Sequence, residues 1–119
     1  QEGSPFSDAI EKFRLWCNGG AFVTWGPCDY EMLEDNMYIH NVDSSWLPEM
    51  YDAQEIFDDQ VTMEGRQFAL SYAIFYFKIK PFEAHNALND TLNTVKVLER
   101  LDFIKGIEEQ REYYYADVV

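Results

Sequence analysis

The sequence predicts an α/β fold in which helices outweigh strands. Apolar residues recur at helical spacing in several segments, whereas residues 21–25 alone have the β-branched and aromatic content of a clear buried strand. Hydrophobic residues make up 47% of the chain, which is enough for a packed core and argues against disorder. The length of 119 residues corresponds to one domain or to part of one.

The first half of the chain is expected to alternate helices and strands. Ser7 is a candidate helix N-cap, and two glycines stop the helix that follows it. Tyr30, Leu33 and Met37 are spaced to face inward from a second helix. The expected elements are a helix at residues 8–17, the strand at 21–25, a helix at 29–39, a short strand at 50–52 and a helix at 54–60.

The second half is expected to be helical. A strongly apolar helix at residues 66–77 is followed by a loop that contains Pro81. The helix at residues 87–101 has a regular apolar stripe, which we expect to face the core. Its members are Leu88, Leu92, Val95, Leu98 and Leu101. Residues 103–119 form a charged tail.

Charge is unevenly distributed. The formal net charge is −13, and residues 15–65 contain no Lys or Arg. Such a balance disfavours binding nucleic acid through charge alone, and solvated acidic helix faces account for most of it. An acidic pocket that binds divalent metal can still act on phosphates, because the metal supplies the positive charge.

The sequence shows no sign of a membrane or secretory segment. No apolar run is long enough to span a bilayer, and no basic segment followed by an apolar one opens the chain. Cys17 and Cys28 lack the CxxC spacing and neighbouring histidines of a zinc site. We expect both to be reduced thiols in a cytoplasmic protein that has no membrane partner.

Two motifs contain residue types that suit catalysis. His85 and Asp90 lie five positions apart where a loop enters a helix, which suits a general base and a metal-binding carboxylate. Alone, this spacing often arises by chance in an aspartate-rich chain. Asp29 comes just after the expected strand, where α/β sheets position functional side chains, although it could simply cap its helix.

Together these motifs resemble one family. The patterns Trp25-Gly26…Asp29…Leu33 and Ala84-His85-Asn86-Ala87-Leu88-Asn89-Asp90, with the helix containing Leu70-Ser71-Tyr72-Ala73 between them, are similar to the DnaQ-like, or DEDDh, 3′-to-5′ exonucleases. The resemblance covers roughly residues 4–102. It implies a ribonuclease H-like fold.

The resemblance also implies an activity and roles for residues. The complete protein would release nucleoside monophosphates from a DNA or RNA 3′ end with two Mg²⁺ or Mn²⁺ ions. Asp29 and Asp90 would bind the metals, and His85 would be the general base. Trp25, Lys78 and Lys80 would contact the nucleic acid, unless the indole packs internally and the lysines are only solvated.

One family motif is missing. No segment matches the Asp-x-Glu that supplies two further carboxylates, and one clear strand cannot cover the expected helices. Residues 1–119 are therefore expected to be the carboxyl-terminal part of one exonuclease domain, amino-terminally incomplete, with one clear strand and one short one. The chain would be truncated, completed by another polypeptide that carries Asp-x-Glu (as a homo- or hetero-oligomer), or degenerate. The alternative function is a catalytically silent acidic interaction module.

Overall fold

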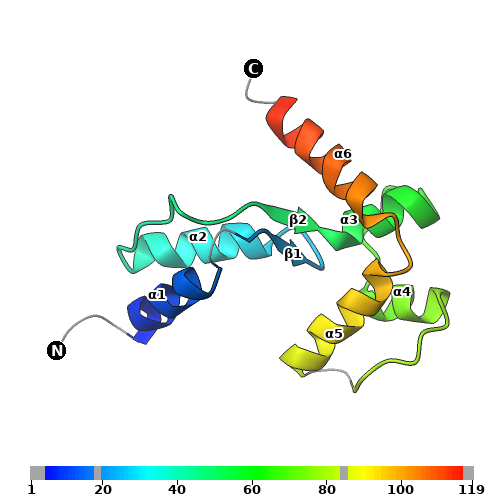
Figure 1. Cartoon of the computed structure of the whole chain (residues 1–119), viewed down its shortest axis with the longest axis horizontal. Coiled ribbons are helices and arrows are strands. Elements are labelled where there is room, and N and C mark those ends of the chain that lie inside the picture. Colours follow the sequence, from blue (N-terminus) through cyan, green and yellow to red (C-terminus); the bar gives the residue numbers. More distant parts are fainter. Residues whose placement is uncertain (1–4, 18–19, 84–85, 117–119) are drawn as a thin grey trace. The chain divides into compact units, whose positions relative to one another are not determined.

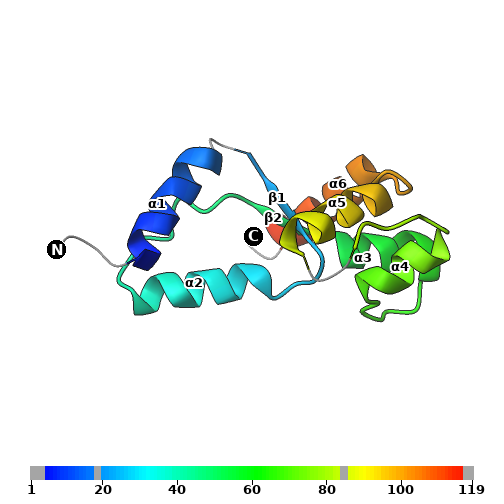
Figure 2. The ribbon, with the colours of Figure 1, turned by 90° about the horizontal axis from the view of Figure 1, so that it is seen from below.

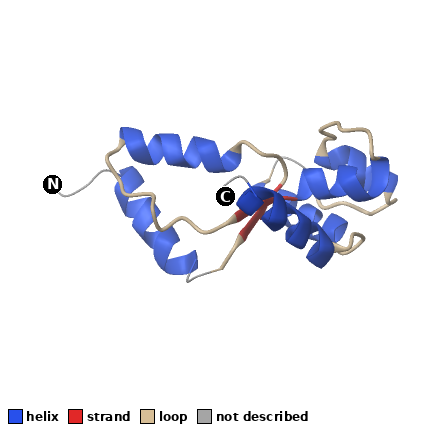
Figure 3. Ribbon diagram, turned by 90° about the horizontal axis from the view of Figure 1, so that it is seen from above, coloured by secondary structure: helices blue, strands red, loops and turns tan. Residues whose placement is uncertain are grey.

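The computed structural model describes residues 5–17, 20–83 and 86–116, without the side chains of 113–116. Most of the described chain is helical (Figure 1), and β1 and β2 pair in a small parallel sheet (Figure 3). The predicted α/β class is thereby confirmed. The elements are α1 (Pro5–Cys17), β1 (Phe22–Thr24), α2 (Asp29–Ile39), β2 (Met50–Asp52), α3 (Ala53–Phe57), the π-helix η1 (Asp58–Thr62), α4 (Leu70–Tyr76), α5 (Ala87–Leu98) and α6 (Phe103–Ala116).

The chain divides into two compact units. The first contains Gln1–Val23 and Pro27–Tyr51, and the second contains Thr24–Gly26 and Asp52–Val119. The first unit thus includes α1 and α2, and the second includes α3, η1, α4, α5 and α6. No helix of the described chain is both long and apolar enough to cross a membrane.

The first unit is held together by stacked aromatic rings and a few buried side chains. Ile10 of α1 is buried, and Phe13 stacks on Phe22 of β1 with ring centroids 5.0 Å apart. The Trp46 ring meets Phe13 edge-on at 6.3 Å. Met37 is the fully buried residue of α2. The helix spans the residues predicted, and the inward position of Met37 is confirmed.

The second unit has a core centred on one phenylalanine. Phe57, the last residue of α3, is fully buried. Four aromatic rings approach it edge-on, with centroids 5.8–6.2 Å away: Phe68, Tyr72, Tyr76 and Phe77. This arrangement is favourable because the positive ring edges face negative ring faces. Helices α4 and α5 contact each other beside this core (Figure 2).

Three carboxamide side chains cross-link the second unit within the described residues. Each donates a hydrogen bond to the carbonyl, and accepts one from the amide, of a single distant residue. These carboxamide clamps are Gln60 on Asp102 (2.8 and 2.9 Å), Gln110 on Asp52 (2.8 and 3.0 Å) and Asn93 on Phe82 (3.1 and 2.8 Å). They provide side-chain partners for the main-chain amides and carbonyls of these residues, which stabilises the contacts between distant segments.

The structure corrects the predicted face of α5. Leu88, Leu92 and Val95 are 66%, 36% and 47% exposed, and the helix buries Asn93 and Val97 instead. The stripe correctly predicted a helix, which ends at Leu98, and Leu101 just beyond it packs against the second unit's core as expected. The stripe did not predict the side on which the earlier turns pack. That core is met by the face containing Val97, which is fully buried.

Other boundaries also differ from the prediction. The helix expected at residues 66–77 begins only at Leu70, because Ala69 has an extended conformation with φ −62° and ψ 152°. The expected helix at residues 54–60 is α3 followed by η1, whose turns are wider. The predicted charged tail is helical as α6 as far as Ala116.

Candidate functional site

Asp29 is the first residue of α2 and its side chain is exposed. The N-cap position belongs to Cys28, which makes no side-chain capping hydrogen bond. Asp29 therefore does not occupy the N-cap, contrary to the simpler interpretation of this aspartate. An anion in the first turn is stabilised by the helix dipole, and the described residues offer its carboxylate no hydrogen-bond partner.

Asp90 lies in the first turn of α5 and is half-buried. The N-cap is Asn86, whose side chain accepts a hydrogen bond from the amide of Asn89 at 3.1 Å. The main-chain carbonyl of Asp90 accepts from the Thr94 hydroxyl at 2.9 Å. Within the described residues, its carboxylate makes no hydrogen bond or ion pair. Helix capping thus leaves this carboxylate available to a ligand.

The third predicted catalytic residue, His85, lies outside the described residues, as does Ala84. Its role as general base stays a prediction. Asp29 belongs to the first unit and Asp90 to the second, so the fold of neither unit fixes the distance between them. Across residues 5–17, 20–83 and 86–116, no group of three or more His, Cys, Asp or Glu side chains is arranged to hold a metal ion.

Trp25, a predicted nucleic-acid contact, packs inside the second unit. Its indole N–H donates to the carbonyl of Phe68 at 2.9 Å, and its ring lies 6.0 Å from that of Phe57. The side-chain Nε2 of Gln54 donates to the same Phe68 carbonyl at 2.9 Å. The Trp25 indole therefore packs internally, as the alternative interpretation of the sequence held.

Lys78 and Lys80 are exposed after α4, so their ammonium groups are accessible to an anionic ligand. Lys78 has a left-handed conformation with φ 55°. Lys96 of α5 donates to the carbonyl of Lys80 at 2.9 Å, and its ammonium lies 4.1 Å from the centroid of the Phe82 ring. The loop before the His85 motif is thus tied to α5.

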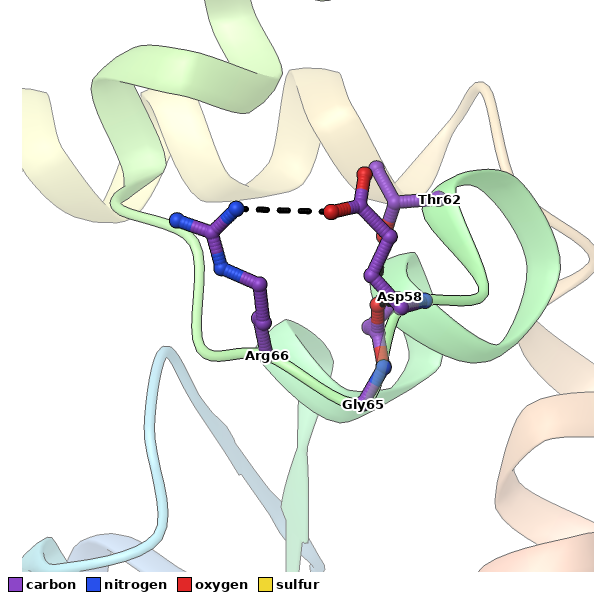
Figure 4. Close-up of polar contacts among 5 residues, drawn as sticks. Asp58, Thr62, Gly65 and Arg66 are labelled. Carbon is purple, nitrogen blue, oxygen red and sulfur yellow. Dashed lines mark hydrogen bonds and ion pairs between the residues drawn. The ribbon is translucent and has the colours of Figure 1, made fainter.

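Asp58 is a buried carboxylate with a structural role. Figure 4 shows it close to Thr62 and Gly65. It accepts from the Thr62 hydroxyl at 2.5 Å and from the amides of Glu64 and Gly65 at 3.0 and 2.9 Å. The Thr62 hydrogen bond, followed by these backbone amides, lowers the pKa of Asp58. Gly65 provides the left-handed φ of 67° that this turn requires. The carboxylate closes the end of η1 rather than facing a ligand.

Neighbouring carboxyl groups repel one another in the same part of the second unit. Burial raises the pKa of Glu55, and the charges of Asp59, Asp52 and Asp58 raise it further. The pKa of Asp59 is also raised, first by burial and then by Asp58, Glu109 and Asp52. We call these five residues the acidic cluster. Their mutual repulsion makes this region electronegative.

Asn93 was not recognised as a functional candidate from the sequence. It is 2% exposed and lies one helical turn before the buried Val97. No pattern in the sequence marked this asparagine, because its partner is the backbone of Phe82 and the apolar stripe indicated the opposite side of α5.

No protein-family model, curated protein or solved structure matches this chain. The family resemblance therefore rests on the residues of the two motifs. The geometry adds the positions of Asp29 and Asp90, each in the first turn of a helix.

Proposed function

We propose that this chain supplies part of a metal-dependent 3′-to-5′ exonuclease with a ribonuclease H-like fold, which releases nucleoside monophosphates from DNA or RNA 3′ ends. One observation carries the proposal beyond the motifs. Asp29 and Asp90 both lie in the first turn of a helix, while Cys28 and Asn86 occupy the cap positions. Both motif carboxylates are consequently left for another ligand.

The donor atoms fit a hard divalent cation. Carboxylate oxygens are the ligands that Mg²⁺ and Mn²⁺ prefer, and Asp29 and Asp90 supply them. When bound, two such ions stabilise the charge that develops in an in-line displacement at phosphorus. Two carboxylates are fewer than the family uses. In this proposal the Asp-x-Glu pair comes from a polypeptide segment outside these 119 residues.

The other residues take roles that follow from their chemistry. In the proposal His85 accepts a proton, because imidazole titrates near neutral pH. Lys78 and Lys80, both exposed, contact the phosphate backbone. In the proposal the protein is cytoplasmic, where Cys17 and Cys28 would remain free thiols.

The experiment uses the assembled exonuclease, in which Asp-x-Glu is present, and an oligonucleotide labelled at its 5′ end. We expect a ladder of products shortened from the 3′ end, dependent on Mg²⁺ or Mn²⁺. Asp90→Asn should lower the rate by about 100-fold or more, because transition-state charge is left unbalanced. The matched control is Glu99→Gln, an exposed carboxylate at the other end of the same helix. Internal cleavage, full activity in EDTA, or an active Asp90→Asn would overturn the proposal.

A second function, the silent acidic interaction module, is favoured by the acidic cluster and its raised pKa values at Glu55 and Asp59. Its negative field would attract a basic partner. The assay above separates the two functions. An assembled protein that contains Asp-x-Glu yet never shortens a 3′ end would leave the interaction module as the better account.

A further inference from the structure

The amino-terminal half of α5 is attached to the second unit by very little apolar contact. Among residues 87–94, all of which the structure describes, Asn93 alone is buried. Leu88 and Leu92 of the same turns are 66% and 36% exposed. Apolar burial within these turns is therefore slight, and the buried apolar residue of the helix is Val97, one turn further on.

The Asn93 clamp acts together with Val97 to fix the direction in which these turns present their side chains. The carboxamide accepts from the Phe82 amide at 2.8 Å and donates to the Phe82 carbonyl at 3.1 Å. Phe82 follows Ile79, which is buried in the core cluster that also contains Val97. The clamp thereby ties α5 to a segment that is itself anchored in the core. Lys96 adds a second tie through the Lys80 carbonyl and the Phe82 ring.

Asp90 lies on the face of α5 that this clamp orients. Positions 90, 93 and 97 are spaced by three and four residues, so they share one side of a helix. Val97 sits in the core, Asn93 is clamped one turn earlier, and Asp90 follows in the first turn. A rotation of the helix about its axis would break both clamp bonds and swing Asp90 away.

We propose that Asn93 is a positioning residue that holds Asp90 in its metal-binding orientation, an inference that rests on the proposed function. Only a carboxamide suits this role, because one acceptor and one donor are needed for the two backbone groups of Phe82. A carboxylate has no donor for the carbonyl, and an apolar side chain would leave both groups unpaired. Partners of this kind that orient metal ligands typically change metal affinity by about 10–100-fold when removed.

The test follows Mn²⁺ binding to the assembled exonuclease, in which Asp-x-Glu is present and this 119-residue chain is ¹⁵N-labelled, through paramagnetic broadening of the Asp90 amide signal. We expect Asn93→Leu to raise the Mn²⁺ concentration for half-broadening by about 10-fold. Hydrogen exchange at the Phe82 amide should accelerate in the same variant, because its acceptor is gone. Asn93→Ser, whose hydroxyl is too short to bracket both groups, should shift the midpoint in the same direction by a smaller factor and decides the matter if Asn93→Leu does not fold.

Gln60→Leu is the matched control, because it removes a clamp of the same chemistry on Asp102. In Gln60→Leu the Mn²⁺ concentration for half-broadening at Asp90 should stay within about 2-fold of that of the unsubstituted chain. The increase in Asn93→Leu should be several times larger. Equal shifts in the two variants would mean that Asn93 only stabilises the fold. An unsubstituted chain that broadens at Asp90 while Asn93→Leu leaves the midpoint unchanged overturns this inference alone. A chain that shows no broadening at Asp90 overturns the proposed function and this inference with it.

Discussion

The two units differ in how they bury apolar surface. Both units expose large apolar side chains, such as Trp16 (74%) and Tyr38 (86%) in the first and Phe75 (82%) in the second, but the first buries few of them, chiefly Ile10 and Met37. The second unit surrounds Phe57 with aromatic rings and joins α3, α4 and α5 through a continuous buried cluster. The second unit is thus expected to hold its fold through its own core, whereas the first depends on stacking between partly exposed rings.

Hydrogen bonding differs in the same direction. The carboxamide clamps all lie in the second unit and join residues 11, 42 and 58 positions apart. In the first unit, side-chain bonds such as Ser45 to Asp43 and Asn36 to the Met32 carbonyl are local. Long-range bonds oppose unfolding of a whole unit, whereas local ones stabilise single turns. Asp90 is therefore held by the more firmly built unit.

The largest effect is expected at the centre of the second core. Phe57→Ala should cost about 4 kcal/mol of unfolding free energy, because a fully buried ring is replaced by a cavity. Phe13→Ala, which removes a half-buried ring of the first unit, should cost about 1–2 kcal/mol. Urea denaturation followed by circular dichroism measures both. Equal losses would contradict the difference drawn between the units.

A smaller loss is expected where α6 crosses α3. A Cβ at Gly106 would lie 2.7 Å from Cγ2 of the buried Ile56. Replacing glycine in a helix usually gains about 1 kcal/mol, but overpacking a core costs about 1–3 kcal/mol. Gly106→Ala should therefore destabilise the chain by about 1 kcal/mol net. In an Ile56→Ala background the crowding atoms are gone, and the same substitution should become neutral or stabilising.

The acidic residues of the second unit should make the unfolding free energy depend on pH in two opposite ways. The raised pKa values of Glu55 and Asp59 mean that protonation favours the folded state as pH falls from neutral toward their ordinary values of 4.5 and 3.8. The lowered pKa of Asp58 means that its contribution is present above 3.8 and is lost as pH falls below that value.

The measured unfolding free energy should accordingly rise on mild acidification and fall again in stronger acid. The Asp58→Asn variant should have a lower unfolding free energy than the unsubstituted chain at neutral pH, because the hydrogen-bonded carboxylate is absent. For the same reason its unfolding free energy should fall less in the acid range. Thermal unfolding at a series of pH values measures both effects. A stability that declines steadily from neutral pH would rule out the raised pKa values at Glu55 and Asp59.

Local patterns predicted the elements better than their contacts. Residues 29–39 and 50–52 form the helix and strand expected, because glycine, proline and apolar spacing act over a few residues. The prediction of the buried face of α5 was wrong, because an apolar stripe does not show which other part of the chain will pack against it. The clamps were invisible in the sequence, because each glutamine or asparagine meets a backbone group of no distinctive residue type. The site could be predicted only as far as the aspartates of its motifs.

The central claim is that Asp29 and Asp90, rather than the acidic cluster, are the metal ligands of this chain. Titrating the assembled exonuclease, in which this chain is ¹⁵N-labelled, with Mn²⁺ and recording which backbone amide signals broaden first tests this directly. We predict that the amides around Asp29 and around Asp90 broaden at the lowest Mn²⁺ concentrations, and that Asp90→Asn abolishes the broadening around position 90. Broadening that begins at Asp52, Glu55 and Asp59 while the signals of Asp29 and Asp90 stay sharp would contradict the account.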